Sequence, residues 1–467
     1  MATTITCDVL GQGKYPGAHF DIETSKTISP DEQELPMTRD RRYYIIALAL
    51  SICVLLETLS LTYLQQSGST FYYSSSILYL LSGLAVCILP LVPVSKISFL
   101  KTPARINKSI PYLLGAFILF LIGHHIVRLT TEYSNMPIDA RIADMLPCLQ
   151  VACRRFLHGE VVYGPAPEIY PGSIIPYLPA MWIPFIPASI LGFDFRWVTV
   201  AMQLFCVGLA MMPVLNRNRS IPLLPAIIGA AALFLLFNYF LYKRTDYWTM
   251  TEEGVVAGFY LLLSLALLRR NYWLIGLAIM CCTLSRYSLI LWIPVYFGFV
   301  FLTRPRSDFW KLFLSYTGGM LAVFVIPFFI RDPLYFIHIP RGYIGLTDRF
   351  WHSYGVEEHL LYNVGLFKFF SFGQVHNMLI LEVITSFLAP LILILSALWL
   401  KKRFELNDRY FAYASFKISM VFFYAFIQMP YLYVFVPLTL MSFAVLFDYL
   451  AGQGGESSAP GATAPVV

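Results

Sequence analysis

The stretch that decides how this chain is organised is a polar segment between apolar runs, Pro137-Ile138-Asp139-Ala140-Arg141-Ile142-Ala143-Asp144-Met145-Leu146. It places two carboxylates and an Arg beside long hydrophobic segments, and its polar character continues through Arg154, Arg155 and Glu160. A chain built for lipid does not expose such charges beside a membrane unless they have a use. The side of the membrane that they face therefore decides most of the functional interpretation.

The composition predicts an all-α, polytopic integral membrane protein. Apolar residues make up 58% of the chain and charged residues 13%, whereas a soluble globular chain is roughly 25% charged. The mean hydropathy is +0.66. The net charge of +6 resides in short basic clusters between apolar runs, which is typical of topology signals and not of nucleic-acid binding. No cleavable signal peptide is expected, because the first 40 residues are polar and mixed.

About twelve transmembrane helices are predicted from apolar runs long enough to cross about 30 Å of hydrocarbon. Three of them are short, so the region 254–302 could be counted differently. The predicted spans cover residues 43–64, 76–93, 110–129, 197–215, 221–241, 254–268, 273–287, 288–302, 312–330, 378–400, 410–428 and 431–450.

The basic residues predict which loops face the cytoplasm, because loops rich in Lys and Arg stay inside. They place both termini in the cytoplasm and the loops 130–173, 242–253 and 331–377 outside. The cytoplasmic clusters are Arg39, Arg41, Arg42; Lys96, Lys101, Arg105, Lys108; Arg217, Arg219; Arg269, Arg270; Arg304, Arg306, Lys311; and Lys401, Lys402, Arg403.

The apolar stretch 174–191 interrupts this count. It contains Pro176, Pro179, Pro184 and Pro187, and each Pro inside a regular helix costs about 3 kcal/mol. We therefore expect an interfacial or re-entrant helix on the outer side. The alternative is a Pro-kinked span that would put residues 217–219 outside.

Three polar segments are thus expected to meet on the outer face, where a lipid phosphate is one ligand that would account for so many cations. They carry Asp139, Asp144, Arg154 and Arg155; Lys243, Arg244, Asp246, Glu252 and Glu253; and Arg341, Asp348, Arg349, His352, Glu357, Glu358 and His359.

At these residues the sequence resembles the GT-C membrane glycosyltransferases, in their mannosyltransferase-like branch of the family 87 type. The resemblance covers roughly residues 110–330 and lacks an Asp-x-Asp motif. It rests on Asp144-Met145-Leu146-Pro147, Arg155-Phe156-Leu157-His158-Gly159-Glu160, Tyr163, Tyr170-Pro171, Tyr177-Leu178-Pro179, Arg196, Glu252-Glu253-Gly254 and Leu284-Ser285-Arg286-Tyr287-Ser288.

The resemblance implies a domain plan. Residues 1–42 would be a cytoplasmic polar segment and 43–109 two additional transmembrane helices. Residues 110–330 would form the catalytic module, 331–377 an extracytoplasmic loop, 378–450 the C-terminal helices and 451–467 a disordered tail. The protein would lie in the cell (inner) membrane with its active site outside.

The resemblance also implies the chemistry, which is the transfer of a sugar from a polyprenyl-phosphate donor to a glycan or glycolipid acceptor. Asp144 is the expected general base, with Asp139 in reserve. Arg286 is expected to bind the donor phosphate, where it replaces a Lys of the family pattern. The further donor-binding candidates are Lys243, Arg244, Arg341 and Arg196, and the substrate-binding candidates are Glu252, Glu253, Tyr170 and Tyr177. No cofactor is predicted, and a divalent metal stays open.

Each of these residues also has a purely structural interpretation. Asp144 could cap the following helix, and Arg286 could extend its charge to a helix end. Lys243 and Arg244 could be interfacial anchors, and Glu252 and Glu253 could favour a helix N-terminus. The rival functions are a lipid or glycolipid transporter or flippase and a non-catalytic membrane protein; no matching inverted halves support a transporter.

Overall fold

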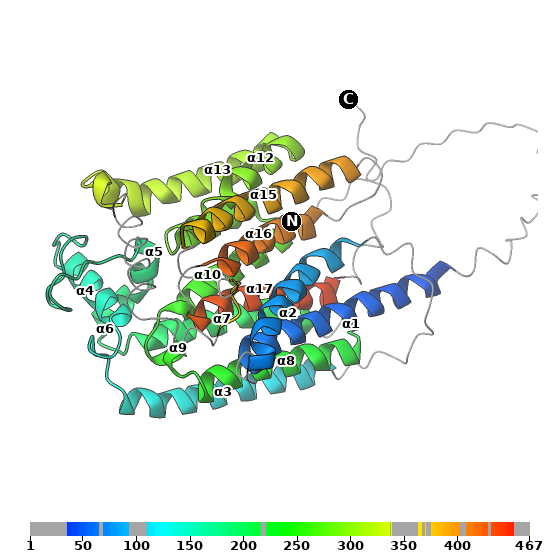
Figure 1. Ribbon diagram of the computed structural model, residues 1–467, viewed down its shortest axis with the longest axis horizontal. Helices are drawn as coiled ribbons and strands as arrows, with labels where there is room; N and C mark the ends of the chain where they lie inside the picture. The colour runs from blue at the N-terminus through cyan, green and yellow to red at the C-terminus, as the bar shows by residue number, and fades with distance from the viewer. Residues whose placement is uncertain are drawn as a thin grey trace, which may run out of the picture.

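The protein is described from a computed structural model, which covers residues 35–64, 69–92, 110–215, 221–336, 338, 363–366, 369, 375–401, 408–427 and 431–452. These residues form a bundle of helices (Figure 1), which confirms the all-α prediction. Within them the single extended pairing is a bridge between Pro165 and Ile174. The α-helices are α1 Leu35–Thr62, α2 Ser69–Ile88, α3 Ile110–Asn135, α4 Met145–Leu157, α5 Pro179–Trp182, α6 Ile186–Leu191, α7 Arg196–Leu215, α8 Leu223–Tyr242, α9 Asp246–Thr249, α10 Glu253–Arg269, α11 Tyr272–Thr283, α12 Trp292–Thr303, α13 Arg306–Met320, α15 Val375–Lys401, α16 Asp408–Ala425 and α17 Val436–Gly452. Shorter turns are the 3-10 segments η3 Leu89–Leu91, η5 Ile183–Phe185, η6 Tyr287–Leu289 and η11 Leu432–Phe435, and η7 Leu321–Phe329 is a π-helix.

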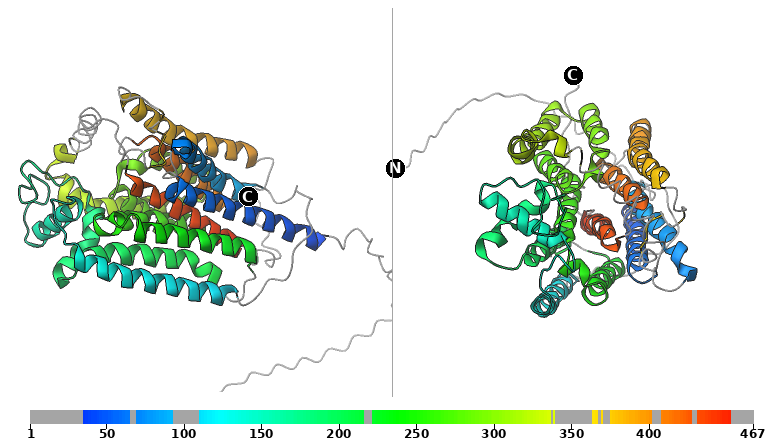
Figure 2. Two further views of the ribbon diagram at one scale, coloured as in Figure 1. Left: turned by 60° about the horizontal axis from the view of Figure 1, so that its bottom comes forward. Right: turned by 60° about the vertical axis from the view of Figure 1, so that its left-hand side comes forward.

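The helix α17 forms the axis of the bundle. The other helices surround it (Figure 2), and 94% of its most apolar stretch is buried inside the bundle. It packs against α10, α7, α1 and α16. The outermost helices are much less buried. Only 22% of the apolar stretch of α3, and 11% of the stretch that runs through α13 and η7, is buried inside the bundle. Apolar surface on a helix that crosses a membrane is solvated by lipid, so these exposed faces are compatible with a bilayer around the bundle.

Within the described residues, eight helices are long and apolar enough to cross a membrane, and they correspond to eight of the twelve predicted spans. The other four predicted spans also form helices, which are α10 with 17 residues, α11 and α12 with 12 each, and α16 with 18. At 1.5 Å per residue, α11 and α12 are each about 18 Å long, less than the hydrocarbon thickness. The multi-pass character is therefore supported, and the count of about twelve stays a prediction.

The segment between α11 and α12 carries Arg286. The preceding turn, from α10 into α11, is sharp because Arg270 adopts a left-handed conformation, with φ at 54°, and the Asn271 side chain caps α11 by accepting from the Leu274 amide at 3.2 Å. Gly276 lets α11 approach α13 closely, since a Cβ there would lie 2.6 Å from the Leu312 carbonyl oxygen. The helix α11 therefore packs directly on α13.

The stretch 174–191 forms a broken helix. Within it, α5, η5 and α6 together span only residues 179–191, which at 1.5 Å per residue is too short to cross about 30 Å. Trp182 and Phe185 are fully buried. The length fits the predicted interfacial or re-entrant helix better than the alternative of a Pro-kinked span.

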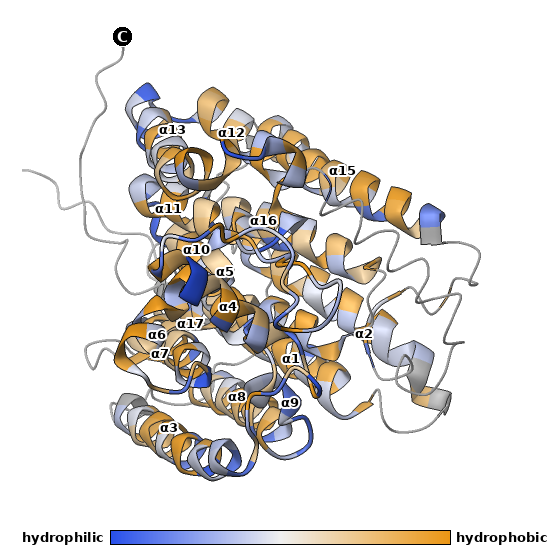
Figure 3. Cartoon of the chain, turned by 90° about the vertical axis from the view of Figure 1, so that its left-hand side faces the viewer, coloured by the Kyte–Doolittle hydropathy of each residue, from blue (hydrophilic) through white to orange (hydrophobic). Residues whose placement is uncertain are grey.

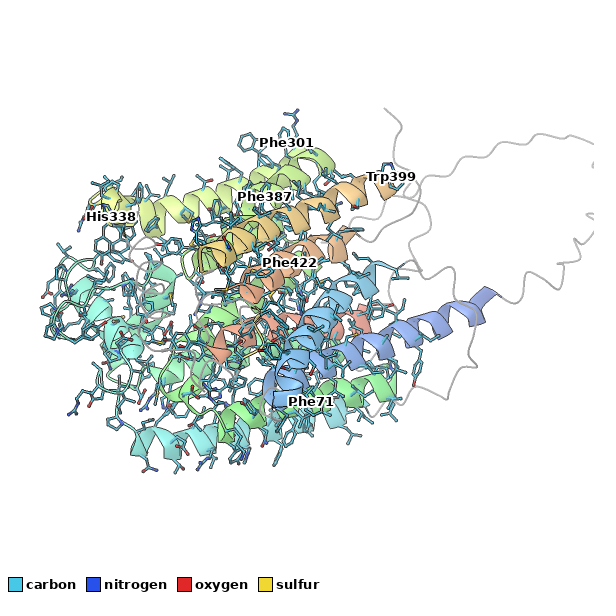
Figure 4. All side chains as sticks on the ribbon, viewed as in Figure 1. Phe71, Phe301, His338, Phe387, Trp399 and Phe422 are labelled. Atoms are coloured by element: carbon cyan, nitrogen blue, oxygen red, sulfur yellow. The ribbon has the colours of Figure 1, made fainter. Side chains whose placement is uncertain are left out.

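The bundle has one end rich in irregular structure. The helices α4, α5 and α6 lie there, opposite the start of α1 (Figure 1), and hydrophilic segments gather around α4 and α9 (Figure 3). His338 lies at the same end and Trp399 at the other (Figure 4). This arrangement places the segment 137–146 at the end opposite the basic start of α1, as the predicted topology requires.

The structure adds detail to the N-terminal part of the predicted domain plan. Helix α1 begins at Leu35, so residues 35–42 are its first turns and not part of a separate polar segment. The predicted N-terminal addition is also an integral part of the bundle, because α1 packs on α8 and α17 as well as on α2. Most of the predicted loop 331–377 and the predicted tail beyond residue 452 lie outside the described residues.

A buried ion pair joins α1 to α16 and α17 in the interior of the bundle. Lys417 Nζ lies 3.1 Å from both carboxylate oxygens of Glu57, and both side chains are 0% exposed. Lys417 also donates to the Leu438 carbonyl at 3.1 Å and to the Ser442 hydroxyl, and Ser442 donates to Glu57 at 2.5 Å. Each charge therefore has an opposite charge and further hydrogen bonds, the condition under which charges are tolerated in a low-dielectric interior.

We expect Lys417→Met to lower the free energy of unfolding by about 3–5 kcal/mol, because it leaves the Glu57 carboxylate buried without its partner. The double variant Glu57→Leu with Lys417→Met should recover most of that loss, since no unpaired charge remains. Thermal unfolding of the purified protein in lipid nanodiscs measures both. A matched control is Lys311→Met, which removes a surface pair with Asp308 at 2.9 Å and should change the stability by less than about 1 kcal/mol. Additive losses in the double variant would contradict this account.

Candidate functional site

Asp144 stands at the N-cap position of α4, but its side chain makes no capping hydrogen bond. Its carboxylate instead accepts from the Tyr170 hydroxyl, with Oη and Oδ2 at 3.2 Å. The capping alternative is therefore not realised by the side chain. The carboxylate is directed to the loop that contains Tyr170 and is partly buried.

Asp139 has a different environment. Arg141 encloses its carboxylate, with the backbone amide at 2.9 Å and Nε at 3.0 and 2.9 Å. Hydrogen bonds from Arg141 lower the pKa of Asp139 to about 2, from an ordinary value of 3.8. A carboxylate of such low basicity that is already paired is poorly suited to accept a proton, so the structure favours Asp144 over Asp139.

Glu252 and Glu253 lie at the start of α10 and are 1% and 0% exposed. The position of this helix start is fixed by Gly254, because a Cβ there would lie 2.8 Å from the carbonyl oxygen of Thr199 on α7. The glycine thus allows α10 to approach α7 until both carboxylates are covered. Buried carboxylates require partners.

Arg286 supplies the partner of Glu253. It follows α11 in an extended conformation, where the Leu284 carbonyl accepts from the Ala180 amide of α5 at 3.1 Å. Its guanidinium forms an ion pair with Glu253, and its side chain is 22% exposed. The sequence near Arg286 offers no such carboxylate, because Glu253 lies 33 positions earlier in the chain and meets Arg286 only in the fold. The role of Arg286 in binding the donor phosphate stays a prediction.

Glu252 connects these groups with Asp144. It interacts electrostatically with Arg286 and with Asp144; burial raises the pKa of Glu252, Arg286 lowers it, and Asp144 raises it further. Its Oε2 atom has no hydrogen-bond partner among the described residues. We call Asp144, Glu252, Glu253 and Arg286 the carboxylate–arginine cluster. It holds three carboxylates against one cation, so a further cation or proton would be stabilised there.

Tyrosines form the wall beside the cluster. Tyr177 interacts electrostatically with Glu252, Asp144 and Tyr433, and Tyr431 interacts with Asp144. Tyr431 and Tyr433 are stacked at 5.1 Å, and the Tyr433 hydroxyl contacts Met145 Sδ at 3.9 Å. The fold thus places Tyr170 and Tyr177 near Asp144, and their role in substrate binding stays a prediction.

Tyr431 and Tyr433 were not predicted as site residues. They lie nearly 290 positions after Asp144 and carry no motif. The one available signal was that a Tyr-rich segment begins the last span, and such segments are ordinary at membrane interfaces.

Among the described residues, none of the other predicted cations forms an ion pair with the cluster, although Arg244 interacts electrostatically with Tyr433 beside it. Arg196 is 2% exposed, and its guanidinium binds Asp194 and the carbonyls of Met136 at 2.7 Å and Tyr133 at 3.1 Å. Its donors join α7 to the end of α3, which leaves its predicted phosphate contact without support. Arg244 pairs with Asp246 at 2.8 Å.

The last two predicted cations are Lys243 and Arg341. Lys243 is exposed at the end of α8. Arg341 lies outside the described residues. Their predicted roles stay predictions, as does the absence of a cofactor.

Arg286→Met should lower the free energy of unfolding by about 3 kcal/mol, because it leaves the buried Glu253 carboxylate without its ion-pair partner. Adding Glu253→Gln to that variant removes the stranded charge and should restore most of the stability. Thermal unfolding in nanodiscs measures both changes. Wild-type stability of Arg286→Met alone would show that the pair is not formed in the membrane.

The comparisons with known proteins leave the site to be interpreted from its own geometry. No protein family, no curated protein and no solved structure matches the chain.

Proposed function

We propose that the chain is a membrane glycosyltransferase that moves a sugar from a polyprenyl-phosphate-linked donor to a hydroxyl of a glycan or glycolipid acceptor. The bilayer would hold the donor's lipid, and the reaction would take place at the end of the bundle that carries α4, on the extracytoplasmic face of the cell (inner) membrane. No cofactor is part of the proposal.

The observation that carries the proposal is the state of Asp144. Its carboxylate does not cap the helix, and it accepts a hydrogen bond from the Tyr170 hydroxyl at 3.2 Å. It also interacts electrostatically with the buried Glu252 carboxylate, which interacts in turn with Arg286. A carboxylate that accepts a hydrogen bond from a hydroxyl is placed to act as a general base toward a hydroxyl substrate. That property, next to a guanidinium, suits a group that receives a proton while negative charge develops nearby.

The chemical step balances with these groups. The acceptor hydroxyl oxygen attacks C1 of the sugar, and Asp144 takes the hydroxyl proton. The bond between C1 and the phosphate oxygen breaks, and its electron pair leaves with the polyprenyl phosphate. Cations near that oxygen lower the barrier because its charge grows in the transition state.

Arg286 is the proposed cation, and the ion pair with Glu253 defines how it would act. The guanidinium has a fork of donors and can bind a carboxylate and a phosphate at once. Glu253 would then hold the fork in position while the phosphate occupies its remaining donors. Lys243, Arg244 and Arg341 are proposed as further donor-binding cations, and Glu252 and Tyr177 as substrate contacts.

A second candidate function is a lipid or glycolipid transporter or flippase, and one observation favours it. Charged residues in the interior of transmembrane helices often mark transport paths, and Glu57 and Lys417 are such residues. Their fully paired state, with donors of Lys417 occupied by Glu57, Leu438 and Ser442, favours a structural role instead. A non-catalytic membrane protein is the third interpretation.

Asp144→Asn should insert and fold normally and lose sugar transfer by about 10²-fold or more, because it keeps the shape and removes the basicity. Release of polyprenyl phosphate from synthetic polyprenyl-phosphate hexoses, with the protein in nanodiscs, measures the rate. Asp139→Asn is the matched control and should retain most of the activity, since Arg141 already holds that carboxylate. Loss in Asp139→Asn with retention in Asp144→Asn would move the base to Asp139, and retention in both would end the carboxylate mechanism.

The sidedness of the site is tested separately. Val161 lies in the loop after α4 and is 70% exposed, so Val161→Cys should react with a membrane-impermeant thiol reagent added outside intact cells. Ser307→Cys at the opposite end, at the start of α13, should react only after permeabilisation. The parent protein gives the background from its native cysteines. The reverse pattern would place the cluster in the cytoplasm, where an extracytoplasmic donor cannot reach it.

A further inference from the structure

A recess of about 630 Å³ opens at the same end of the bundle as Asp144 but is separate from the carboxylate–arginine cluster. It is enclosed by the end of α3, by α4, by α6 and by the turn into α7. Its volume lies within the range of about 300–1,000 Å³ that is usual for small-molecule sites. The residues that matter here are Tyr133, Gln150, Ser189, Phe193, Asp194 and Arg196.

The recess and the cluster lie on different faces of α4. Cys148 interacts with Asp144 and Glu252, so that side of the helix faces the cluster. Gln150 lines the recess, and two residues further along a helix correspond to about 200° of rotation. The helix α4 therefore separates two sites while belonging to both.

The charges that line the recess neutralise each other. Arg196 binds the Asp194 carboxylate through Nε at 2.9 and 3.1 Å, and its other donors are taken by the Met136 and Tyr133 carbonyls. The Arg196 guanidinium also lies over the Tyr133 ring at 4.2 Å. A guanidinium that is 2% exposed and bound in this way has little capacity for an anion, so the recess is not built for a phosphate.

The remaining lining combines neutral hydrogen-bonding groups with an exposed aromatic ring. Gln150 contributes an amide, which both donates and accepts, and Ser189 contributes a hydroxyl. Phe193 is 39% exposed and is directed by Gly192, which ends α6 in a left-handed conformation with φ at 71°. Sugar rings present hydroxyls at their rim and C–H groups on their faces, which such a set of side chains matches.

We propose that this recess binds neutral saccharide units, as the part of a glycan acceptor that lies beyond the reacting hydroxyl. The acceptor role rests on the proposed function; the saccharide site itself does not. The Gln150 amide would pair with ring hydroxyls, and the Phe193 ring would cover an apolar sugar face.

Saturation-transfer NMR tests the site with full-length protein in nanodiscs and three neutral trisaccharides, built of mannose, glucose or galactose. At least one should bind, and Phe193→Ala and Gln150→Leu should each weaken it about 3- to 10-fold. Asp144→Asn should bind it as well as the parent protein, because it lies on the other face of α4. Inorganic phosphate should not compete.

Three results would overturn the proposal: no binding of any of the three trisaccharides, unchanged binding in both recess variants, or displacement by phosphate. Thermal unfolding of Phe193→Ala and Gln150→Leu shows whether they remain folded, and a solvent-exposed change such as Leu191→Ala is the matched control. Binding together with full activity of Asp144→Asn would retire the proposed reaction and keep the saccharide site. Loss of activity in Asp144→Asn without binding would do the opposite.

Discussion

The buried pair of Glu57 and Lys417 is the constraint on which the rest of the structure depends. Two charges in a low-dielectric interior are stable only when they meet with good geometry and further hydrogen bonds, and Ser442 and the Leu438 carbonyl supply those bonds. The requirement fixes the height of α1 and α16 relative to α17. Because apolar helices slide past one another at little cost in lipid, where burial gives no strong driving force between them, a polar contact of this kind is what sets their register.

The same register extends to the candidate site. Ser442 lies on α17, and the segment directly before this helix contains Tyr431 and Tyr433. Tyr431 interacts with Asp144, and Tyr433 contacts Met145. A second ion pair, Glu253 with Arg286, joins the segment between α11 and α12 to the start of α10. One of these ion pairs aligns the long helices, and the other shapes the site. Both would be unstable if either partner were left alone.

The site itself is a balance of charge and not a single motif. Asp139 forms an ion pair with Arg141, Glu253 forms one with Arg286, and Asp194 forms one with Arg196. Asp144 and Glu252 are the carboxylates for which the described residues offer no guanidinium in an ion pair. Of these two, Asp144 is the partly buried one and accepts a hydrogen bond from Tyr170, whereas Glu252 is almost fully buried.

The amino-acid sequence by itself determined the helical membrane class, because long apolar runs have no other stable conformation in lipid. Each of the predicted spans forms a helix in the structure. The prolines before α7 predicted the broken helix there, and the charged residues around Asp144 predicted the polar end of the bundle. Only the tertiary structure decided which charges meet. The pairs Glu57 with Lys417 and Glu253 with Arg286 join residues that are 360 and 33 positions apart, and no local pattern reports such distances. An ionisable residue in a span signals that a partner exists, whereas the identity of the partner follows from packing, which the sequence does not display.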